Sequence, residues 1–355
     1  MKILFDFSVS NQTGAFQRIQ ATLEFYENLN GQFFILNSNL KNKNEPQKNN
    51  VIEFFDPKIK HRLMQNTGYI DVFIKKYGQP DIFFSYGIPV IKKIGVVNWF
   101  HISNALSLNT SNITISLFLK LKMIFFRKRI KKSIPFLDVV SGESDATLKL
   151  FHHVFGKKNH ITNVKLSNGF KSDELNELSS IKNKTDDNYV VAIGIQSYKS
   201  INAAYKVFLH LKKERKNINK LILIASPFDN LNDKSLVSDH VRKDVNVVLL
   251  APTKRLEVLK LLKGAKIFIS MSQIENSSNA LLEASLFCSE LIVSDIPSHR
   301  EFLSENCYFD EITLPITKMT LLNARKGIKD KSVLKSWNKC IKLFDNKAKV
   351  ILDNH

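Results

Sequence analysis

The sequence has 355 residues and only three cysteines, Cys288, Cys307 and Cys340, none of which stands in a C-x-x-C pair. A structural zinc site or a disulfide framework needs paired cysteines at regular spacings, so the sequence predicts neither. We expect the three thiols to serve as small buried hydrophobic side chains.

Long hydrophobic runs are also absent. No stretch approaches the roughly 20 apolar residues that a membrane-spanning helix needs. Met1–Phe7 passes directly into a strand-like run, without the basic start and long apolar core of a signal peptide. We therefore expect a cytoplasmic protein. With 44% hydrophobic residues, the chain is long enough for two globular domains that each have a core.

Several phosphate-binding motifs are missing. The sequence contains no G-x-x-x-x-G-K-[ST] and no G-x-G-x-x-G, so ATP and dinucleotide sites of the usual kinds are not expected. It also contains no D-x-D, the motif that holds a diphosphate through a bridging divalent metal ion. We expect neither a metal nor another cofactor.

Acidic residues are scarce relative to basic ones. The chain has 52 Lys and Arg against 33 Asp and Glu, which gives a net charge of +19. Such an excess indicates an anionic partner, which could be nucleic acid, anionic lipid or a phosphate-rich substrate. No recognisable DNA- or RNA-binding motif accompanies the charge, so we expect no nucleic-acid partner and keep a basic nucleic-acid-binding protein as an alternative.

Part of this charge is concentrated in Ile115–Ser133, which carries seven basic and no acidic residues among bulky apolar ones. As a helix, this segment would place apolar side chains beside cations, the pattern of a helix that lies on a membrane surface. A core helix with a basic outer face fits equally well, and the sequence leaves both open. The basic residues are Lys120, Lys122, Arg127, Lys128, Arg129, Lys131 and Lys132.

The first half alternates strand-like and helix-like segments, which predicts a parallel sheet covered by helices. The expected strands are Ile3–Phe7, Phe33–Asn37, Asp81–Ser85, Val96–Phe100 and Phe136–Val140, and Phe16–Tyr26 is an expected helix. Ligands of such sheets bind at the carboxyl ends of strands. Two features fall there: the polar loop Ser8–Gly14 and His101, directly after a strand. A lone histidine is usually structural, so His101 either contacts substrate or packs in the core.

A polar, charged stretch at Lys171–Asn188 reads as a linker, after which the alternation restarts. We predict an N-terminal domain over 1–170, a linker over 171–188, a second domain over 189–331 and, in 332–355, a C-terminal helix that packs back towards the first domain. The expected elements are Tyr189–Gly194, Leu221–Ala225 and Val245–Leu250 as strands, with Ile201–Lys212, Thr253–Leu262 and Ser332–Leu352 as helices.

The segment from Gly264 to Glu301 organises the second half. It predicts a strand (Ile267–Ser270), a polar loop, a helix capped by Ser277 or Ser278, and a strand (Leu291–Ser294). The free amides at the start of such a helix suit a phosphate group. Glu275 lies on the loop, whereas Glu283 lies in the apolar helix sequence LLEASLF, where a buried carboxylate is costly unless it meets a partner.

This segment resembles the signature of family-4 retaining glycosyltransferases, which have the GT-B fold. The matching residues are two glutamates eight positions apart, a Glu-Ala pair, a strand that ends in Ser-Asp and a downstream glutamate: Glu275, Glu283, Ala284, Ser294, Asp295 and Glu301. The chain departs from the family at Asn276-Ser277-Ser278, where Gly-Phe-Gly is usual, and at Ser289-Glu290-Leu291, where Gly-x-Pro is usual. Val164–Phe170 resembles the Asn-Gly element that ends the family's first domain.

The resemblance implies an α/β protein with two Rossmann-like domains whose parallel sheets face each other across a cleft. It also implies roles for four residues: Glu275 positions the donor sugar, Glu283 holds the nucleotide ribose, Lys199 offsets the donor diphosphate, and His101 contacts the transferred sugar. The family places an arginine near Lys199, and here Ile195 or Gln196 stands in its place. Further expected donor-site residues are Gly194, Ser277, Ser278, Asn279 and Gly14.

By the same resemblance, the enzyme should move a sugar from a nucleotide-sugar donor to a saccharide acceptor with retention of configuration. The expected acceptor is a lipid-linked saccharide of a bacterial surface polysaccharide (O-antigen, capsule or lipopolysaccharide). The enzyme would then be peripheral on the inner face of the cytoplasmic membrane, bound through the basic segment. A different GT-B enzyme that uses nucleotide sugars, such as an epimerase, is the main alternative.

Overall fold

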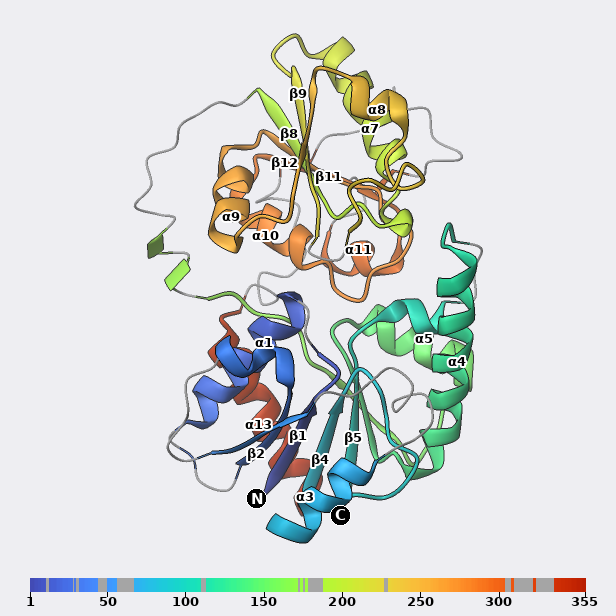
Figure 1. Ribbon diagram of the computed structural model, residues 1–355, viewed down its shortest axis with the longest axis vertical. Helices are drawn as coiled ribbons and strands as arrows, with labels where there is room; N and C mark the ends of the chain where they lie inside the picture. The colour runs from blue at the N-terminus through green and yellow to red at the C-terminus, as the bar shows by residue number, and fades with distance from the viewer. Residues whose placement is uncertain are drawn as a thin grey trace. The chain divides into compact units, whose positions relative to one another are not determined.

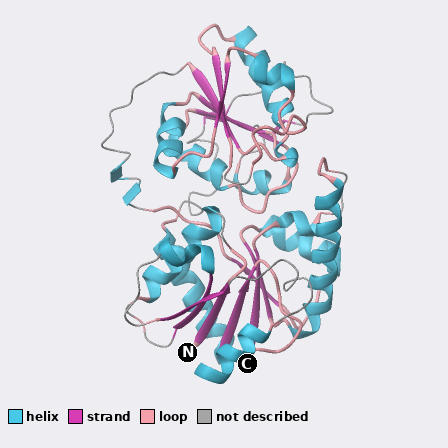
Figure 2. Cartoon of the chain, in the orientation of Figure 1, coloured by secondary structure: helices cyan, strands magenta, loops and turns pink. Residues whose placement is uncertain are grey.

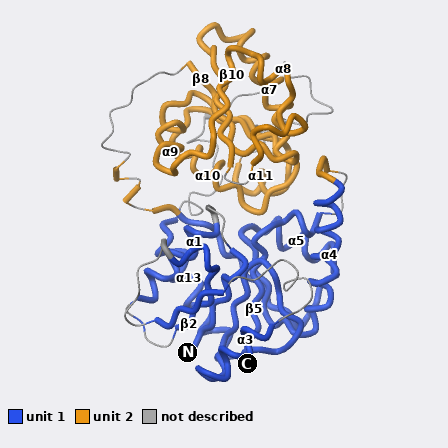
Figure 3. Tube along the Cα trace, viewed as in Figure 1, with its two compact units in different colours: residues 1–110, 117–169, 335–355 blue, residues 111–116, 170–334 orange. Residues whose placement is uncertain are grey.

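The structure is a computed structural model that describes all residues except 11–12, 28, 30–31, 44–49, 56–66, 110–112, 172, 175, 178–187, 227–228, 304–307, 310–321 and 324–334. The chain forms two compact units (Figure 3). Unit 1 comprises Met1–Thr110, Leu117–Gly169 and Lys335–His355, and unit 2 comprises Ser111–Ser116 and Phe170–Leu334. In the part of the chain that is described, no helix is both long and apolar enough to cross a bilayer.

Unit 1 is built on a sheet in the order β3-β2-β1-β4-β5-β6-β7, in which every pairing is parallel. Parallel neighbours require a crossover between strands, and helices supply most of these crossovers (Figures 1 and 2). The strands are β1 (Ile3–Phe7), β2 (Gln32–Asn37), β3 (Val51–Phe55), β4 (Ile82–Tyr86), β5 (Val97–Ile102), β6 (Val139–Gly142) and β7 (Thr162–Lys165).

Helices cover both faces of this sheet. One face packs against α1 (Thr13–Tyr26) and the C-terminal α13 (Trp337–Asp353). The other packs against α3 (Gly68–Tyr77), α4 (Leu117–Ser133) and α5 (Asp145–Phe155). Because side chains alternate along a strand, β1 and β4 send Phe5 and Phe84 to the first face and Leu4 and Phe83 to the second. The sheet is therefore buried on both sides.

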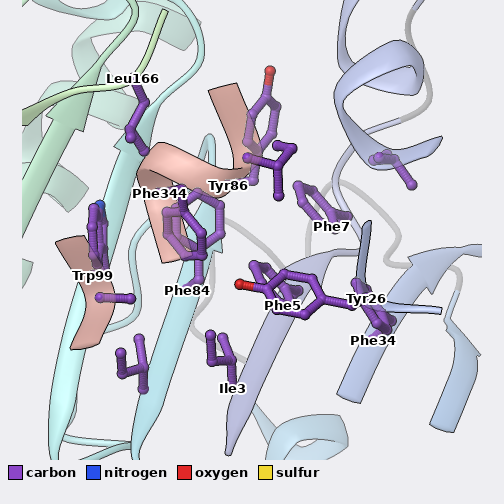
Figure 4. Packing of buried hydrophobic residues seen from close by; sticks show 14 of the residues in the cluster. Ile3, Phe5, Phe7, Tyr26, Phe34, Phe84, Tyr86, Trp99, Leu166 and Phe344 are labelled. Carbon is purple, nitrogen blue, oxygen red and sulfur yellow. The ribbon is translucent and has the colours of Figure 1, made fainter. Parts of the chain in front are cut away.

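The core beneath α1 and α13 is rich in aromatic rings (Figure 4). Phe344 of α13 lies 5.2 Å from Phe84 and 4.9 Å from Trp99, measured between ring centroids. Tyr26 of α1 donates a hydrogen bond of 2.9 Å to the buried carboxylate of Asp345 in α13. Burial and this carboxylate raise the pKa of Tyr26, so its hydroxyl stays protonated and can donate.

A glycine allows α13 to dock. A Cβ atom on Gly169 would lie 2.6 Å from the backbone nitrogen of Trp337, much closer than real Cβ contacts. The absence of a side chain at Gly169, the last residue of the second segment of unit 1, lets this backbone run against the start of α13. Glycine suits a position where another stretch of backbone approaches so closely.

Unit 2 repeats the architecture with the order β10-β9-β8-β11-β12-β13, again parallel, and a short antiparallel β14 beside β12. The strands are β8 (Tyr189–Ile193), β9 (Lys220–Ile224), β10 (Val247–Leu250), β11 (Ile267–Ser270), β12 (Glu290–Ser294), β13 (Tyr308–Phe309) and β14 (Leu322–Asn323). The helices are α7 (Ile201–Glu214), α8 (Asp239–Lys243), α9 (Arg255–Gly264), α10 (Asn279–Phe287) and α11 (Pro297–Phe302).

The helices of unit 2 also divide between two faces of the sheet. Residues of α7 and α8 pack on one face, and residues of α9, α10 and α11 pack on the other. Strand β11 shows the alternation, since Ile267 and Ile269 face the first group and Phe268 faces the second. The predicted α/β class, with two Rossmann-like units that each contain a parallel sheet, is thus confirmed.

Several local predictions need correction. Strand β5 continues to Ile102, because Tyr86 and Ser141 pair with His101 on either side, so His101 lies within the strand. Gly14 lies in the first turn of α1, where amides have no intrahelical partner and a glycine costs little. The expected strand at Phe136–Val140 is shifted to β6, after a 3₁₀ turn at Ile134–Phe136 that contains Pro135.

Four elements of unit 1 were not anticipated: β3, α3, α5 and β7. Cys288 and Cys340 are buried as expected, whereas Cys307 lies outside the described residues. Much of the expected linker, including residues 178–187, also lies outside them.

Candidate functional site

The carboxyl ends of three neighbouring strands in unit 2 bring the predicted residues together. Strands β8, β11 and β12 lie side by side in parallel, so the loops that follow them leave the same edge of the sheet. Lys199 follows β8, Glu275 follows β11, and Ser294 is the last residue of β12. This edge is where ligands bind in open parallel sheets.

The loop after β8 has an unusual backbone that positions Lys199. Gly194 adopts φ +84°, a conformation that favours glycine, and Ser200 is in the left-handed region at φ +49°. The loop is attached to its neighbour, because the backbone amide of Gln273 donates to the carbonyl of Tyr198 at 2.8 Å. The Gln273 side chain also donates to Ser200 Oγ at 2.8 Å. These contacts hold the loops after β8 and β11 together.

Lys199 and Glu275 form an ion pair across these two loops. The side chains are only 18% and 11% exposed, so the pair is largely removed from water. Burial opposes the charge on each group, but the attraction of its partner dominates: the pKa of Lys199 is raised and that of Glu275 is lowered. Both groups are therefore charged near neutral pH. Ser272 adds a hydrogen bond of 2.7 Å to Glu275 Oε1.

The helix that follows Glu275 begins as predicted, with Ser278 as its cap. The Ser278 hydroxyl accepts a hydrogen bond of 3.3 Å from the amide of Leu281. The neighbouring Ser277 is also buried, and its hydroxyl has no hydrogen-bond partner among the described residues. Where the family has Gly-Phe-Gly, this chain thus has Asn276 and two hydroxyl side chains, Ser277 and Ser278, beside the first turn of α10, and Asn279 is the first residue of that helix.

Glu283 has the partner that its apolar surroundings required. Arg255, the first residue of α9, donates from Nη1 to Glu283 Oε1 at 2.7 Å. The same guanidinium donates from Nε to Glu174 at 2.9 and 3.0 Å. Burial raises the pKa of Glu283, and the pairing with Arg255 counteracts this shift. The sequence analysis missed Arg255, and the only signal was that a glutamate in LLEASLF needed a cation.

The two glutamates share one arrangement. In each, Oε1 is held by a cation of unit 2, Lys199 for Glu275 and Arg255 for Glu283. The described residues supply no hydrogen bond to either Oε2. Each carboxylate is thus fixed in orientation through one oxygen and keeps the second as an acceptor for a hydroxyl-bearing ligand.

A third group at this edge, His299 of α11, was not predicted. Its ring is fully buried, and Nδ1 lies 2.9 Å from the carbonyl oxygen of Ser294. Nε2 has no hydrogen-bond partner among the described residues. Burial lowers the pKa of His299, and the nearby charge of Glu275 opposes this shift. We refer to Lys199, Arg255, Glu275, Glu283 and His299 as the unit 2 cluster.

The arginine that the family places near Lys199 has no counterpart in this loop. Ile195 is buried in the core, and the Gln196 amide donates to Ser226 Oγ at 2.6 Å and to Asp229. Asp229 also accepts from the backbone amides of Ile195 and Ser226, at 2.9 and 2.7 Å. The position is thus occupied by uncharged residues that are hydrogen-bonded around Asp229, and Lys199 is the cation of the loop.

In unit 1, His101 stacks against two aromatic rings of the neighbouring strand β4. Its ring stacks on Tyr86 at 5.0 Å and on Phe84 at 5.8 Å between centroids, and it is fully buried. Nδ1 lies 2.9 Å from Ser141 Oγ, which also accepts a hydrogen bond of 2.8 Å from the indole nitrogen of Trp99. We refer to Phe84, Tyr86, Trp99, His101 and Ser141 as the unit 1 cluster.

These contacts determine the tautomer of His101. The indole N–H of Trp99 can only donate, so Ser141 Oγ accepts from it, and the serine proton is paired only if it points to His101 Nδ1. The ring proton then sits on Nε2, which has no partner among the described residues. Burial and the nearby Arg18 keep the pKa of His101 well below its ordinary value. The cluster therefore presents a neutral N–H donor.

Helix α4 has an exposed apolar face. Leu117, Phe118, Leu121, Ile124 and Phe125 follow helical spacing along one side and are between 44% and 77% exposed. Met123, Ile130 and Ser133 lie on the opposite side and are buried against the unit. The apolar residues occupy the first half of the helix, and the exposed Lys128, Lys131 and Lys132 continue the same side in the second half.

The remaining basic residues of α4 differ in exposure. Lys120 is exposed, and Lys122 is half-buried with its ammonium over the ring of Phe126. Arg127 donates to the carbonyls of Ser107 and Asn109. Arg129 is 8% exposed and donates to the carbonyl of Pro89 at 3.1 Å. Arg129 therefore does not belong to the outward-facing set in which the sequence analysis placed it.

The described residues include no group of three or more His, Cys, Asp or Glu side chains that could hold a metal ion. The acidic groups of the unit 2 cluster are instead neutralised by Lys199 and Arg255.

Comparison with known proteins gave structural matches only. No protein-family model and no curated protein sequence matches the chain. Sucrose-phosphate synthase from Thermosynechococcus elongatus superposes with a TM-score of 0.69 and 10% identity, over 100% of both chains. A trehalose-6-phosphate synthase, studied for glycosyl transfer with retention, gives 0.64 and 9%, over 98% of this chain and 99% of that one.

HepE from Anabaena, in complex with UDP-glucose, gives a TM-score of 0.56 and 13% identity, over 100% of this chain and 98% of that one. At such identities these matches establish the fold alone. They show that the chain has the GT-B fold, which these glycosyltransferases share.

Proposed function

We propose that the protein is a retaining glycosyltransferase that moves a sugar from a nucleotide-sugar donor to a saccharide acceptor. The observation that carries the proposal is the unit 2 cluster at the carboxyl ends of β8, β11 and β12. There, Lys199 and the first turn of α10 supply positive potential, and two fixed carboxylates each keep one oxygen to which the described residues donate no hydrogen bond. A nucleotide sugar has the matching groups: a diphosphate, a ribose and a hydroxyl-rich sugar.

Each residue then has a role. Lys199 and the amides at the start of α10 stabilise the charge that develops on the leaving diphosphate. Glu275 accepts hydrogen bonds from the donor sugar through Oε2, and Glu283 accepts from the ribose hydroxyls in the same way. Arg255 orients Glu283 and favours its ionised form. His101 offers a neutral N–H donor, which suits a sugar hydroxyl. Gly194 permits the turn that carries Lys199.

We further propose that the acceptor is a lipid-linked saccharide of a bacterial surface polysaccharide and that the enzyme works on the inner face of the cytoplasmic membrane. The exposed side of α4 supports this proposal. Its apolar first half can enter the region between head groups and acyl chains, while its lysines contact anionic head groups. A location at the membrane would give the enzyme access to an acceptor that cannot leave the bilayer.

A thermal-shift screen of nucleotide sugars tests the catalytic proposal, because a ligand that binds only the folded state raises the melting temperature. We expect stabilisation by at least one nucleotide sugar and sugar transfer in the presence of a suitable acceptor. Release of a free sugar isomer without an acceptor would favour an epimerase. Salt-dependent binding of nucleic acid, with no stabilisation by any nucleotide sugar, would favour a nucleic-acid-binding protein.

Sedimentation with liposomes tests the membrane proposal. We expect the protein to sediment with anionic vesicles and to be partly released by high salt, since each lysine near the surface contributes about 1 kcal/mol. Substitution of Lys120, Lys128, Lys131 and Lys132 with glutamine should abolish sedimentation, as should Phe118→Gln combined with Phe125→Gln.

A matched control removes the same charge elsewhere, by substitution of the exposed lysines Lys157, Lys213, Lys216 and Lys220 with glutamine. This variant should sediment nearly as well as the wild type. If the α4 variants also sediment like the wild type, α4 is an ordinary solvated surface and the membrane proposal is wrong.

A further inference from the structure

If the proposed function is correct, donor binding changes the charge balance of the unit 2 cluster. Lys199 is the cation assigned to the donor diphosphate, yet in this structure it neutralises Glu275. A doubly charged diphosphate beside Lys199 would draw on the same positive charge. Glu275 is only 11% exposed, and a buried carboxylate that loses its cation is strongly disfavoured.

His299 is the ionisable group placed to compensate. Its Nδ1 lies 2.9 Å from the carbonyl oxygen of Ser294, which can only accept, so Nδ1 carries the ring proton. Nε2 therefore holds a bare lone pair, buried and without a partner among the described residues. The free protein thus keeps a neutral imidazole with one vacant protonation position beside a buried ion pair.

Two residues, Ser294 and Ser272, connect the segments that carry this ring and Glu275 through their own hydrogen bonds. The Ser294 hydroxyl donates to the carbonyl of Ser272, and the Ser272 hydroxyl donates to Glu275 Oε1 at 2.7 Å. The ring and the carboxylate also interact electrostatically. Ser277 and His299 are the two residues of the described part of unit 2 that have a buried side-chain atom without a hydrogen-bond partner, and both belong to segments that flank this network.

Three charged side chains act on His299. The carboxylates of Glu275 and Asp295 favour its protonation, and Lys199 disfavours it. Asp295 is already paired with the guanidinium of Arg300, so Glu275 and Lys199 are the groups whose balance can change. In the free protein, burial and Lys199 together keep the imidazole neutral, and its pKa is lowered. An anion bound to Lys199 shifts the balance towards protonation.

We propose that His299 is a reserve counter-ion for Glu275, which takes up a proton at Nε2 when the donor diphosphate engages Lys199. The proton comes from solvent and returns to it when the nucleoside diphosphate leaves. Nδ1 keeps its bond to the Ser294 carbonyl throughout, so no contact within the protein has to break. Donor binding should therefore tighten as pH falls, by at most about tenfold per pH unit for one linked proton.

Calorimetric titration with UDP-glucose near neutral pH, in buffers of different ionisation enthalpy, measures this proton directly. A nucleotide sugar has no group that titrates in this range, so any proton taken up on binding must be bound by a group of the protein. We expect uptake that approaches one proton per donor bound in the wild type and none in His299→Asn. An asparagine amide can still donate to the Ser294 carbonyl but cannot take up a proton. The exposed His240 of α8 provides the control, and His240→Asn should behave like the wild type.

The outcomes separate the inference from the proposed function. Binding of UDP-glucose without proton uptake would overturn the inference and leave the proposed function intact. If no nucleotide sugar binds, both fail. A measurement without ligand tests the inference again: an NMR titration of His299 should show a higher pKa in Lys199→Gln than in the wild type. An unchanged value would show that Lys199 does not control this histidine, and the inference would be wrong.

Discussion

The two clusters use different chemistry, although both lie on parallel sheets that helices cover on two faces. The unit 2 cluster consists of two ion pairs, in which Lys199 and Arg255 hold the glutamates. The unit 1 cluster contains no ion pair among its five members: Trp99, Ser141 and His101 are linked by neutral hydrogen bonds among aromatic rings. A member of an ion pair can exchange its partner for a charged ligand. The neutral hydrogen bonds of the unit 1 cluster can only orient one N–H group, that of His101. We therefore assign the charged part of the donor to unit 2 and a neutral hydroxyl to unit 1.

The largest effect should come from Glu275 in unit 2. Glu275→Gln keeps the shape of the side chain but removes the charge that pairs with Lys199. We expect turnover to fall about 100- to 1,000-fold, the scale seen when one preorganised contact to the reacting centre is lost. Steady-state kinetics and donor titrations should show a smaller change in donor affinity. Wild-type turnover in a folded Glu275→Gln variant would break the assignment of charge chemistry to unit 2.

Glu283 should affect donor binding more than turnover, because its role is to hold the ribose. Glu283→Ala should weaken donor binding by about 1.5–3 kcal/mol, the usual scale for hydrogen bonds to a charged group. Arg255→Met gives a matched test, since it leaves Glu283 in place but without its cation. Both variants should raise the dissociation constant in calorimetry. Unchanged donor affinity in both would remove the second ion pair from the proposed site.

The buried histidines of the two clusters should change the free energy of unfolding at low pH to different extents. His101 and His299 are buried and neutral, with pKa values below the ordinary 6.5 of histidine, whereas the unfolded chain protonates them near that value. The free energy of unfolding should therefore fall as pH drops below about 6.5, by up to about 1.4 kcal/mol per pH unit for each group. Glu283, whose pKa is raised, acts in the opposite direction.

Urea unfolding at several pH values measures this dependence. His101→Asn should flatten the curve more than His299→Asn, because only His101 has a pKa well below its ordinary value. If His299→Asn flattened the pH dependence of the free energy of unfolding more than His101→Asn, the histidine with the larger decrease in pKa would be His299 of unit 2, contrary to our expectation.

The smallest expected effect is that of a chelator. The unit 2 cluster neutralises charge with Lys199 and the start of α10, and the sequence has no D-x-D. Sugar transfer should therefore continue unchanged in excess EDTA. Complete loss of activity, restored by manganese or magnesium, would mean that a metal ion supplies charge that we assign to side chains.

The local pattern around Glu275 and Glu283 was sufficient to predict the strand, loop and capped helix in which they lie. Arg255, the partner of Glu283, and the nearby His299 could not be predicted, because they belong to other helices and come near the glutamates only through the order of the strands. The apolar surroundings of Glu283 did indicate that a cation was needed.

In unit 1 the sequence was less informative. The α4 sequence places bulky apolar and basic residues on every side of the helix. Its periodicity alone therefore did not show that Arg129 faces inward. The extension of β5 through His101 depends on pairing with Tyr86 and Ser141, which no local pattern reveals. The predictions failed where tertiary contacts, and not local preferences, decide the structure.

The docking of α13 has a consequence for how the protein is made. Unit 1 begins with the first strand of the chain, yet its core includes Trp337 and Phe344, which are synthesised more than 300 residues later. Until they leave the ribosome, the rings of Phe5, Phe84 and Trp99 lack part of their cover, while unit 2 already has all the helices of its own core. The domain that is translated first is therefore expected to complete its folding last, and a ribosome that stalls before α13 would leave an aromatic surface open to chaperones.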